Sequence, residues 1–213
     1  MMINLHQKYE QQSIQQEASE NDPFTLERYE QFYKFFPKGA SRILDVGCST
    51  GIGGLHLKKI DSSLILSGLD CVEARLESLP ECYSERIYGL STDVPIEDQS
   101  VDVIVAGEFI QCLYPSDVDK TLCEFQRVLR NRGRLLLTTP NPNYIKEKIK
   151  KSSIYDHVGQ QCQQFPRILR TRLLMHGFSR IKILGSGKVS RYLGWHFPIK
   201  SAYGSYLIIA SKH

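Results

Sequence analysis

The chain has 213 residues, of which 41% are hydrophobic and 23% charged, and its formal net charge is +4. These values fit one folded domain over residues 1–213 and argue against disorder beyond the N-terminus. No apolar run approaches the roughly 18 residues that a membrane-spanning helix needs. The polar start of the chain lacks the apolar stretch of a secretory signal, so we expect a cytoplasmic protein without a membrane span.

The charge is unevenly distributed along the chain. Residues 1–40 carry 4 basic and 6 acidic side chains, residues 41–140 carry 10 and 15, and residues 141–213 carry 13 and 2. The last third is therefore strongly cationic on an acidic body. A solvated face would explain this, and so would a surface that attracts an anionic acceptor, such as a phosphosugar, a lipid headgroup or RNA.

The six cysteines are scattered and include no CxxC pair. This usage is typical of reduced thiols in a cytosolic protein and gives no sign of a disulfide framework or a zinc site. A metal-dependent catechol-type enzyme would need an acid after the fifth strand, where Pro140-Asn141 stands instead. We predict no metal site.

Hydrophobic periodicity predicts alternating helices and strands. Residues 8–20 have weak helical character, and residues 24–36 form a helix with one apolar face that Pro37 and Gly39 end. Residues 131–133 are predicted as a turn and residues 141–163 as irregular. The remaining predicted strands are 42–46, 64–69, 86–89, 101–106, 134–139, 179–184 and 205–210, and the remaining helices are 52–60, 73–79, 116–129 and 166–176.

Seven strands with interleaved helices predict an α/β fold, a doubly wound, Rossmann-like mixed sheet. The link between the last two strands, residues 185–204, has room only for a very short helix. An antiparallel last strand is therefore expected. No repeat or linker divides the chain.

A glycine-rich turn follows the first predicted strand, as ligand-binding sheets of this kind require. It runs Asp45-Val46-Gly47-Cys48-Ser49-Thr50-Gly51, and Gly47 and Gly51 remove Cβ atoms where a ligand would approach. Asp70 ends the second strand, where its carboxylate could accept hydrogen bonds from two ribose hydroxyls.

Two kinds of cofactor fit such a turn, a dinucleotide or a nucleoside. The dinucleotide pattern G-x-G-x-x-G is absent, because Ser49 stands where the middle glycine would be. Asp45 would repel a pyrophosphate and attract an ammonium group. The turn therefore favours a nucleoside with a cationic amino-acid end.

These segments resemble the class I S-adenosylmethionine-dependent methyltransferases, in particular the ubiquinone, sugar and lipid-modifying branch. The similarity is good over about residues 40–140 and loose over 160–213. The blocks that carry it are residues 43–51, Asp70, and residues 94–104, 108–113, 125–137, 138–142 and 176–178.

The resemblance implies S-adenosylmethionine as cofactor and a role for each matching residue. Asp45 is expected near the methionine ammonium, and Asp70 on the ribose hydroxyls. Cys71 is expected beside the adenine, and Gly107 at the methionine end. The loop under the methionine and ribose is expected to comprise Gly47, Cys48, Ser49 and Gly51.

The chain departs from the family pattern at three places. Many members have Gly-Asp at the end of the third strand, where this chain reads Gly89-Leu90-Ser91. Leu90 can only pack, so Ser91, backbone or water must meet the adenine amino group. Ser49 replaces a glycine, and Cys112 stands where many members have histidine.

The acceptor side is the least defined part of the sequence. Residues 1–38 are expected to form cap helices, and residues 141–204 to include an acceptor lid. His157 in that lid is the candidate general base, with a packing or exposed histidine as the alternative. Tyr9 and Tyr29 are cap residues that could equally be core aromatics.

Three functions from different classes remain open. The first is methyl transfer to a small-molecule, glycan or lipid-precursor acceptor, for which the basic last third allows an anionic molecule, with oxygen as the expected atom. The second is an RNA methyltransferase that uses the basic C-terminal third, although no added RNA-binding module is present and no DNA partner is indicated. The third is a cofactor-binding but inactive relative.

Overall fold

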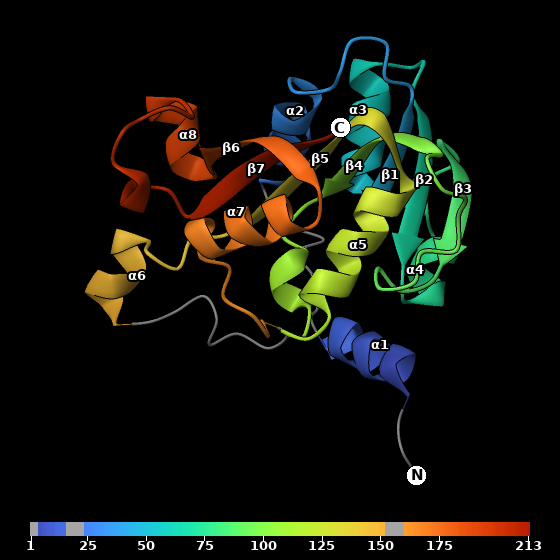
Figure 1. Ribbon diagram of the computed structural model, residues 1–213, viewed down its shortest axis with the longest axis horizontal. Coiled ribbons are helices and arrows are strands. Elements are labelled where there is room, and N and C mark those ends of the chain that lie inside the picture. Colours follow the sequence, from blue (N-terminus) through green and yellow to red (C-terminus); the bar gives the residue numbers. More distant parts are fainter. Residues whose placement is uncertain (1–3, 16–23, 152–159) are drawn as a thin grey trace.

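A computed structural model describes residues 4–15, 24–151 and 160–213 (Figure 1). Within these residues seven strands form one sheet in the order β3-β2-β1-β4-β5-β7-β6. The strands are β1 (Arg42–Val46), β2 (Ile65–Asp70), β3 (Tyr83–Tyr88), β4 (Val101–Ala106), β5 (Leu129–Pro140), β6 (Phe178–Ser186) and β7 (Ser205–Lys212).

Strands β1 to β5 run parallel, and β7 lies antiparallel between β5 and β6. The predicted doubly wound mixed sheet with an antiparallel last strand is confirmed. The helical elements are α1 (Leu5–Gln15), α2 (Thr25–Tyr33), α3 (Ile52–Ile60), α4 (Glu73–Glu77), η1 (Ile110–Cys112), α5 (Val118–Val128), α6 (Ile145–Lys150), α7 (Pro166–Met175), α8 (Lys188–Leu193) and η3 (Lys200–Ala202).

Two hydrophobic cores cover the two faces of the sheet. Helices α5 and α7 close one core, and α2 and α3 close the other, as Figure 1 shows. Strand β4 supplies both cores alternately, with Ile104 and Ala106 in the first and Val103 and Val105 in the second. This alternation explains the unbroken apolar run over residues 103–106, because a central parallel strand is buried on both sides.

Three sequence predictions differ from the structure. Residues 131–133 belong to β5 and not to a separate turn; Arg132 has a φ of 68°, and the pairing with β4 shifts register beside it. Strand β3 begins at Tyr83, earlier than predicted. Its first half carries mostly polar, exposed side chains at the sheet edge, so the sequence shows no apolar run there. Helix α6 lies in a region predicted to be irregular and buries no residue.

Three tyrosine rings fill space that glycines leave open. A Cβ atom on Gly53 would overlap the ring of Tyr29, and one on Gly54 would overlap Tyr83. Gly185 has the same relation to Tyr203. These contacts seat α3 closely against α2 and β3, which brings the turn before α3 to the carboxyl edge of the sheet.

Candidate cofactor pocket

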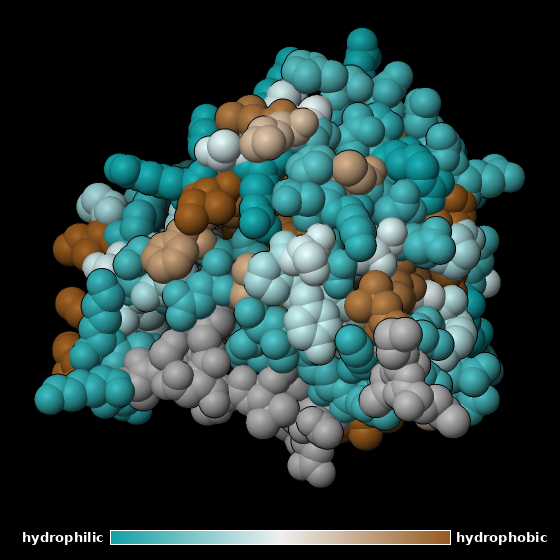
Figure 2. All heavy atoms as spheres, turned by 60° about the horizontal axis from the view of Figure 1, so that its bottom comes forward, coloured by the Kyte–Doolittle hydropathy of each residue, from teal (hydrophilic) through white to brown (hydrophobic). Residues whose placement is uncertain are grey.

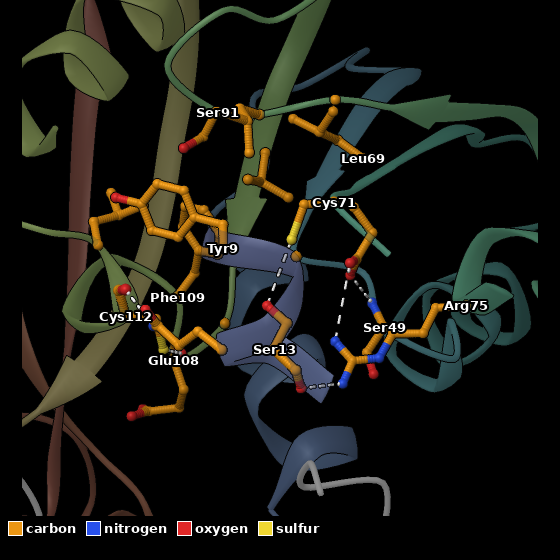
Figure 3. Close-up of a pocket in the computed structure, with 18 of the residues that line it drawn as sticks. Tyr9, Ser13, Ser49, Leu69, Cys71, Arg75, Ser91, Glu108, Phe109 and Cys112 are labelled. Atoms are coloured by element: carbon orange, nitrogen blue, oxygen red, sulfur yellow. Dashed lines mark hydrogen bonds and ion pairs between the residues drawn. The ribbon is translucent and has the colours of Figure 1, made fainter. Parts of the chain in front are cut away.

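A pocket opens at the carboxyl ends of β1, β2 and β4, where the parallel strands of such sheets bind their ligands (Figure 3). Helix α1 closes it from outside. The lining residues are Tyr9, Gln12, Ser13, Arg28, Val46, Gly47, Ser49, Leu69, Asp70, Cys71, Arg75, Gly89, Leu90, Ser91, Gly107, Glu108, Phe109, Cys112 and Leu113.

Most of the predicted cofactor residues come together in this pocket. Those in the lining are Gly47, Ser49, Asp70, Cys71, Leu90, Ser91 and Gly107. Asp45, Cys48 and Gly51 are not part of the lining.

Asp45 differs from the prediction because its side chain points into the core. The residue is fully buried, and its two carboxylate oxygens accept hydrogen bonds of 2.6 Å from the hydroxyls of Tyr29 and Tyr83. Burial raises the pKa of Asp45 to about 6, while the two tyrosine hydrogen bonds lower it. In this structure Asp45 therefore ties α2 and β3 to β1 and does not contact the pocket.

Cys48 and Gly51 have structural positions in the same turn. Cys48 is buried in the core that α2 and α3 close, and burial raises the pKa of its thiol. Gly51 has a φ of 75°, and a Cβ atom there would lie 2.7 Å from Leu79 and Pro80. The glycine is thus required by the turn and its packing, whereas the prediction assigned it to ligand approach.

Asp70 lies in the pocket in the orientation expected of a hydroxyl-binding acid. One carboxylate oxygen accepts from the Ser49 amide and the other from the Val72 amide, each at 3.0 Å. A carboxylate oxygen can accept more than one hydrogen bond, so both oxygens keep accepting capacity. Burial raises the pKa of Asp70, while Arg75, 3.9 Å away, and the amides lower it.

Two residues of the lining have strained backbones. Ser49 has a φ of 50° and Glu108 a φ of 51°, values that residues other than glycine seldom adopt. Such strain concentrates at ligand sites, and these two residues follow different strands. Among the described residues the buried Ser49 hydroxyl oxygen has no hydrogen-bond partner, so it is available to a polar group of a ligand.

Sequence reasoning missed the charged pair Arg28 and Glu108. The Arg28 guanidinium lies 3.9 Å from the Glu108 carboxylate, and Arg28 packs over Gly107. Arg28 precedes Tyr29 on α2, so the hydrogen bond from Tyr29 to Asp45 holds Arg28 at the pocket. The aromatic face of this helix was visible in the sequence, but only the fold shows that its neighbouring arginine reaches β4.

Helix α1 is held over the pocket by polar contacts from several elements. Tyr9 donates to Asp117 at 2.8 Å and accepts from the Tyr114 amide at 2.9 Å. The Arg75 guanidinium donates to the Ser13 carbonyl at 2.7 Å, and Figure 3 shows Ser13 facing Arg75 and Cys71. About 160 Å³ remains free beneath the helix, less than the roughly 300–1,000 Å³ of most ligand pockets.

The end of β3 supplies a packing surface to the pocket. Leu90 lines it as predicted, next to Leu69 of β2. The Ser91 hydroxyl is 2.9 Å from the Thr121 hydroxyl, so part of its hydrogen-bonding capacity is used inside the fold. The two leucines give an apolar wall for a flat ring.

The residues of the lining together suit a ligand with three parts. Asp70 and the unpartnered Ser49 hydroxyl suit sugar hydroxyls, and the leucines suit an aromatic base. Arg28 and Glu108 suit a carboxylate and an ammonium group. A nucleoside with an amino-acid end fits this set.

His157 lies outside the described residues. Within residues 4–15, 24–151 and 160–213, no three His, Cys, Asp or Glu side chains are grouped as metal ligands. No helix in that part of the chain combines the length and apolarity that crossing a bilayer takes.

The strand order, the antiparallel β7 and this pocket define the class I methyltransferase fold. Residues 44–137 match the family model described as the methyltransferase domain. S-adenosylmethionine is a nucleoside with a methionine end, which agrees with the three-part lining.

The two similar proteins described next are also methyltransferases. The chain is 35% identical over 105 residues to malonyl-[acyl-carrier protein] O-methyltransferase 1 of Coxiella burnetii, covering 49% of this chain and 36% of the relative. It is 33% identical over 108 residues to phthiotriol/phenolphthiotriol dimycocerosates methyltransferase 1 of Mycobacterium ulcerans, covering 48% and 38%. The chain thus matches little more than a third of the length of these curated relatives.

The fold itself recurs in solved structures. A SAM-dependent methyltransferase from Archaeoglobus fulgidus superimposes with a TM-score of 0.70 at 20% identity, over 89% of this chain and 93% of that one. At this identity the likeness concerns the fold alone.

Proposed function

We propose that the protein transfers a methyl group from S-adenosylmethionine to an oxygen of a small-molecule, glycan or lipid-precursor acceptor. The observation that carries the proposal is the pocket lining, in which Asp70, the unpartnered Ser49 hydroxyl and the Arg28–Glu108 pair match the cofactor's parts. The names of the two relatives support the acceptor class: one is a malonyl-[acyl-carrier protein] O-methyltransferase and the other a phthiotriol/phenolphthiotriol dimycocerosates methyltransferase.

Each residue of the lining takes a defined role in this proposal. Asp70 holds the ribose hydroxyls, Leu69 and Leu90 pack on the adenine, and Arg28 and Glu108 receive the carboxylate and ammonium of the methionine end. Gly47 and Gly107 leave room at the loop, with Ser49 and Cys71 beside them. Asp45, Cys48 and Gly51 act indirectly by shaping the turn.

The bound cofactor supplies a methyl group already activated by a positively charged sulfur. The protein then has to align the acceptor and exclude water, and alignment of this kind lowers barriers by roughly 7–11 kcal/mol. We assign the covering role to residues 1–38 and the acceptor side to residues 141–204, within one domain. His157 is the proposed base where the acceptor is a neutral hydroxyl. We further propose an anionic acceptor and a cytoplasmic location.

Ligand protection tests the cofactor assignment. S-adenosylhomocysteine should raise the melting temperature, and NAD should not, because the glycine turn lacks the G-x-G-x-x-G pattern of dinucleotide sites. Asp70→Asn should weaken S-adenosylhomocysteine at least about tenfold, since it removes a charge-assisted acceptor. Exposed Asp93→Asn at the neighbouring strand end is the matched control and should bind normally.

Transfer of a radioactive methyl group tests the acceptor class. We expect label in the organic-soluble or small-molecule fraction of a cell extract. Salt-sensitive label in RNA would favour the RNA methyltransferase instead, and cofactor binding without any label would favour an inactive relative.

A further inference from the structure

Helix α6 presents isoleucines to solvent among lysines. Ile145 and Ile149 are 50% and 76% exposed and stand one turn apart. The same segment carries Lys146, Lys148, Lys150 and Lys151 and a single acid, Glu147. Apolar side chains that stay in water do not stabilise a helix without a buried residue. We therefore expect these isoleucines to be covered by a binding partner.

The same composition continues on neighbouring elements. Element η3 lies against α6, and Ile199, just before it, is 57% exposed beside Lys200. At the start of α7, Phe165 and Ile168 are also exposed, with Arg167 between them. We call α6, residues 199–200 and residues 165–168 together the basic apolar face. In Figure 2 hydrophobic and hydrophilic side chains alternate at the left edge, the side on which α6 lies in Figure 1.

A groove opens within this face. Its walls include Phe165, Ile183 and Tyr206, and the cations Arg167 and Lys200 also line it. Its free volume of about 510 Å³ lies in the range of small-molecule sites. The groove can therefore take an apolar chain whose anionic end meets the two cations.

The groove lies close to the cofactor pocket through the sheet. Tyr206 of β7 pairs with Thr139 of β5, and the adjacent Thr138 hydroxyl accepts from the Glu108 amide at the pocket. Strand β7, which lines the groove, and strand β4, which leads to the pocket, are separated by β5 alone. Since neighbouring strands are about 4.8 Å apart, these two strands are about 10 Å apart. A chain molecule in the groove can thus extend toward the transferred methyl group.

We propose that the basic apolar face docks on an anionic lipid bilayer, with the groove open to an acyl chain. Positive charge complements acidic headgroups, and isolated exposed isoleucines suit the boundary between headgroups and acyl chains. A soluble acidic protein would satisfy the charges, but it would need a shaped counterpart to bury side chains that project singly. The benefit of this docking to the protein rests on the proposed function, whereas the experiment below measures membrane binding alone.

Vesicle flotation of the full chain tests the docking. The protein should float with phosphatidylcholine vesicles that contain phosphatidylglycerol and stay behind with phosphatidylcholine alone. The association should weaken at high salt, because exposed charges are screened.

A matched pair of variants locates the contact. Ile149→Ser with Lys150→Gln should weaken flotation roughly tenfold. Ile60→Ser with Lys59→Gln, an exposed isoleucine and lysine on α3 outside the basic apolar face, should leave it within about twofold. Equal flotation on neutral vesicles, an equal loss in both variants, or binding only to a soluble acidic protein would overturn the proposal. S-adenosylhomocysteine protection, measured on the same samples, reports separately on the proposed function.

Discussion

The carboxylate of Asp45 is buried and accepts hydrogen bonds from two tyrosine hydroxyls, and its burial makes the stability of the protein depend on pH. Its pKa is raised from 3.8 to about 6 in the folded protein. The folded state thus holds the proton more tightly than the unfolded chain. The stability that Asp45 contributes is fully present below about pH 4 and is lost as the pH rises through about 6.

We expect Asp45→Asn to flatten this part of the pH profile. The wild-type free energy of unfolding should fall between about pH 4 and pH 7 more than that of the variant, whatever the variant's overall stability. Urea titrations across this range measure the difference. Parallel profiles for the two proteins would assign the pH dependence to other groups.

Ser49 allows backbone strain and ligand contact to be separated. Ser49→Gly removes the hydroxyl and relieves the positive φ, whereas Ser49→Ala removes the hydroxyl alone. The glycine variant should be more stable than the alanine variant by about 1–2 kcal/mol. Both should bind S-adenosylhomocysteine more weakly than the wild type, by calorimetry. Equal stabilities would mean that the turn has relaxed in solution.

At the scale of residues, the sequence predicts the position of the glycine turn but not where each side chain points. The pattern from Asp45 to Gly51 places the turn correctly at the carboxyl edge. The direction of Asp45 depends on Tyr29 and Tyr83, which lie 16 residues before and 38 residues after it. No local pattern reports such distant partners, and the same limit applies to Arg28.

At the scale of elements, α1 covers the pocket. Tyr9, Gln12 and Ser13 of this helix are part of the lining, so we expect the helix to move when the ligand enters and leaves. Tyr9→Phe removes the hydroxyl that joins α1 to Asp117 and the Tyr114 amide. We expect S-adenosylhomocysteine to dissociate several-fold faster from this variant, measured by stopped-flow fluorescence.

A variant distant from the pocket controls for a general loss of stability. Tyr33→Phe removes the hydrogen bond to Asp61 at the other end of the molecule. It should leave the dissociation rate unchanged. An unchanged rate in Tyr9→Phe as well would show that α1 does not limit ligand exchange.

Elements were predicted best where burial sets the pattern. Strands β1 and β4 have the predicted bounds, because both are largely buried parallel strands with mostly apolar side chains. Strand β3 lies at the sheet edge with mostly polar side chains, and α6 has no buried face, so neither produces a clear periodicity. The prediction of element bounds fails where most side chains of the element face solvent and few face the core.

At the scale of the whole molecule, the last strand completes the sheet. Strand β7 lies inside the sheet between β5 and β6, and Lys212 donates to the carbonyls of Gln126 and Leu129. Ending the chain after Gly204 should therefore abolish the cooperative urea transition and the near-ultraviolet circular dichroism signal. Removing only the exposed His213 should change neither. A sigmoidal transition near the wild-type midpoint in the shorter chain would contradict this role of β7.

The tyrosine rings that occupy the space beside Gly53, Gly54 and Gly185 restrict how the sequence can change. A side chain at Gly53 is tolerated only once the ring of Tyr29 has gone, and the same order of events applies to Gly54 with Tyr83 and to Gly185 with Tyr203. Replacement of the glycine while the tyrosine is still present is blocked sterically. In diverging lineages, a larger residue at each of these glycine positions should therefore occur only where the tyrosine has been replaced.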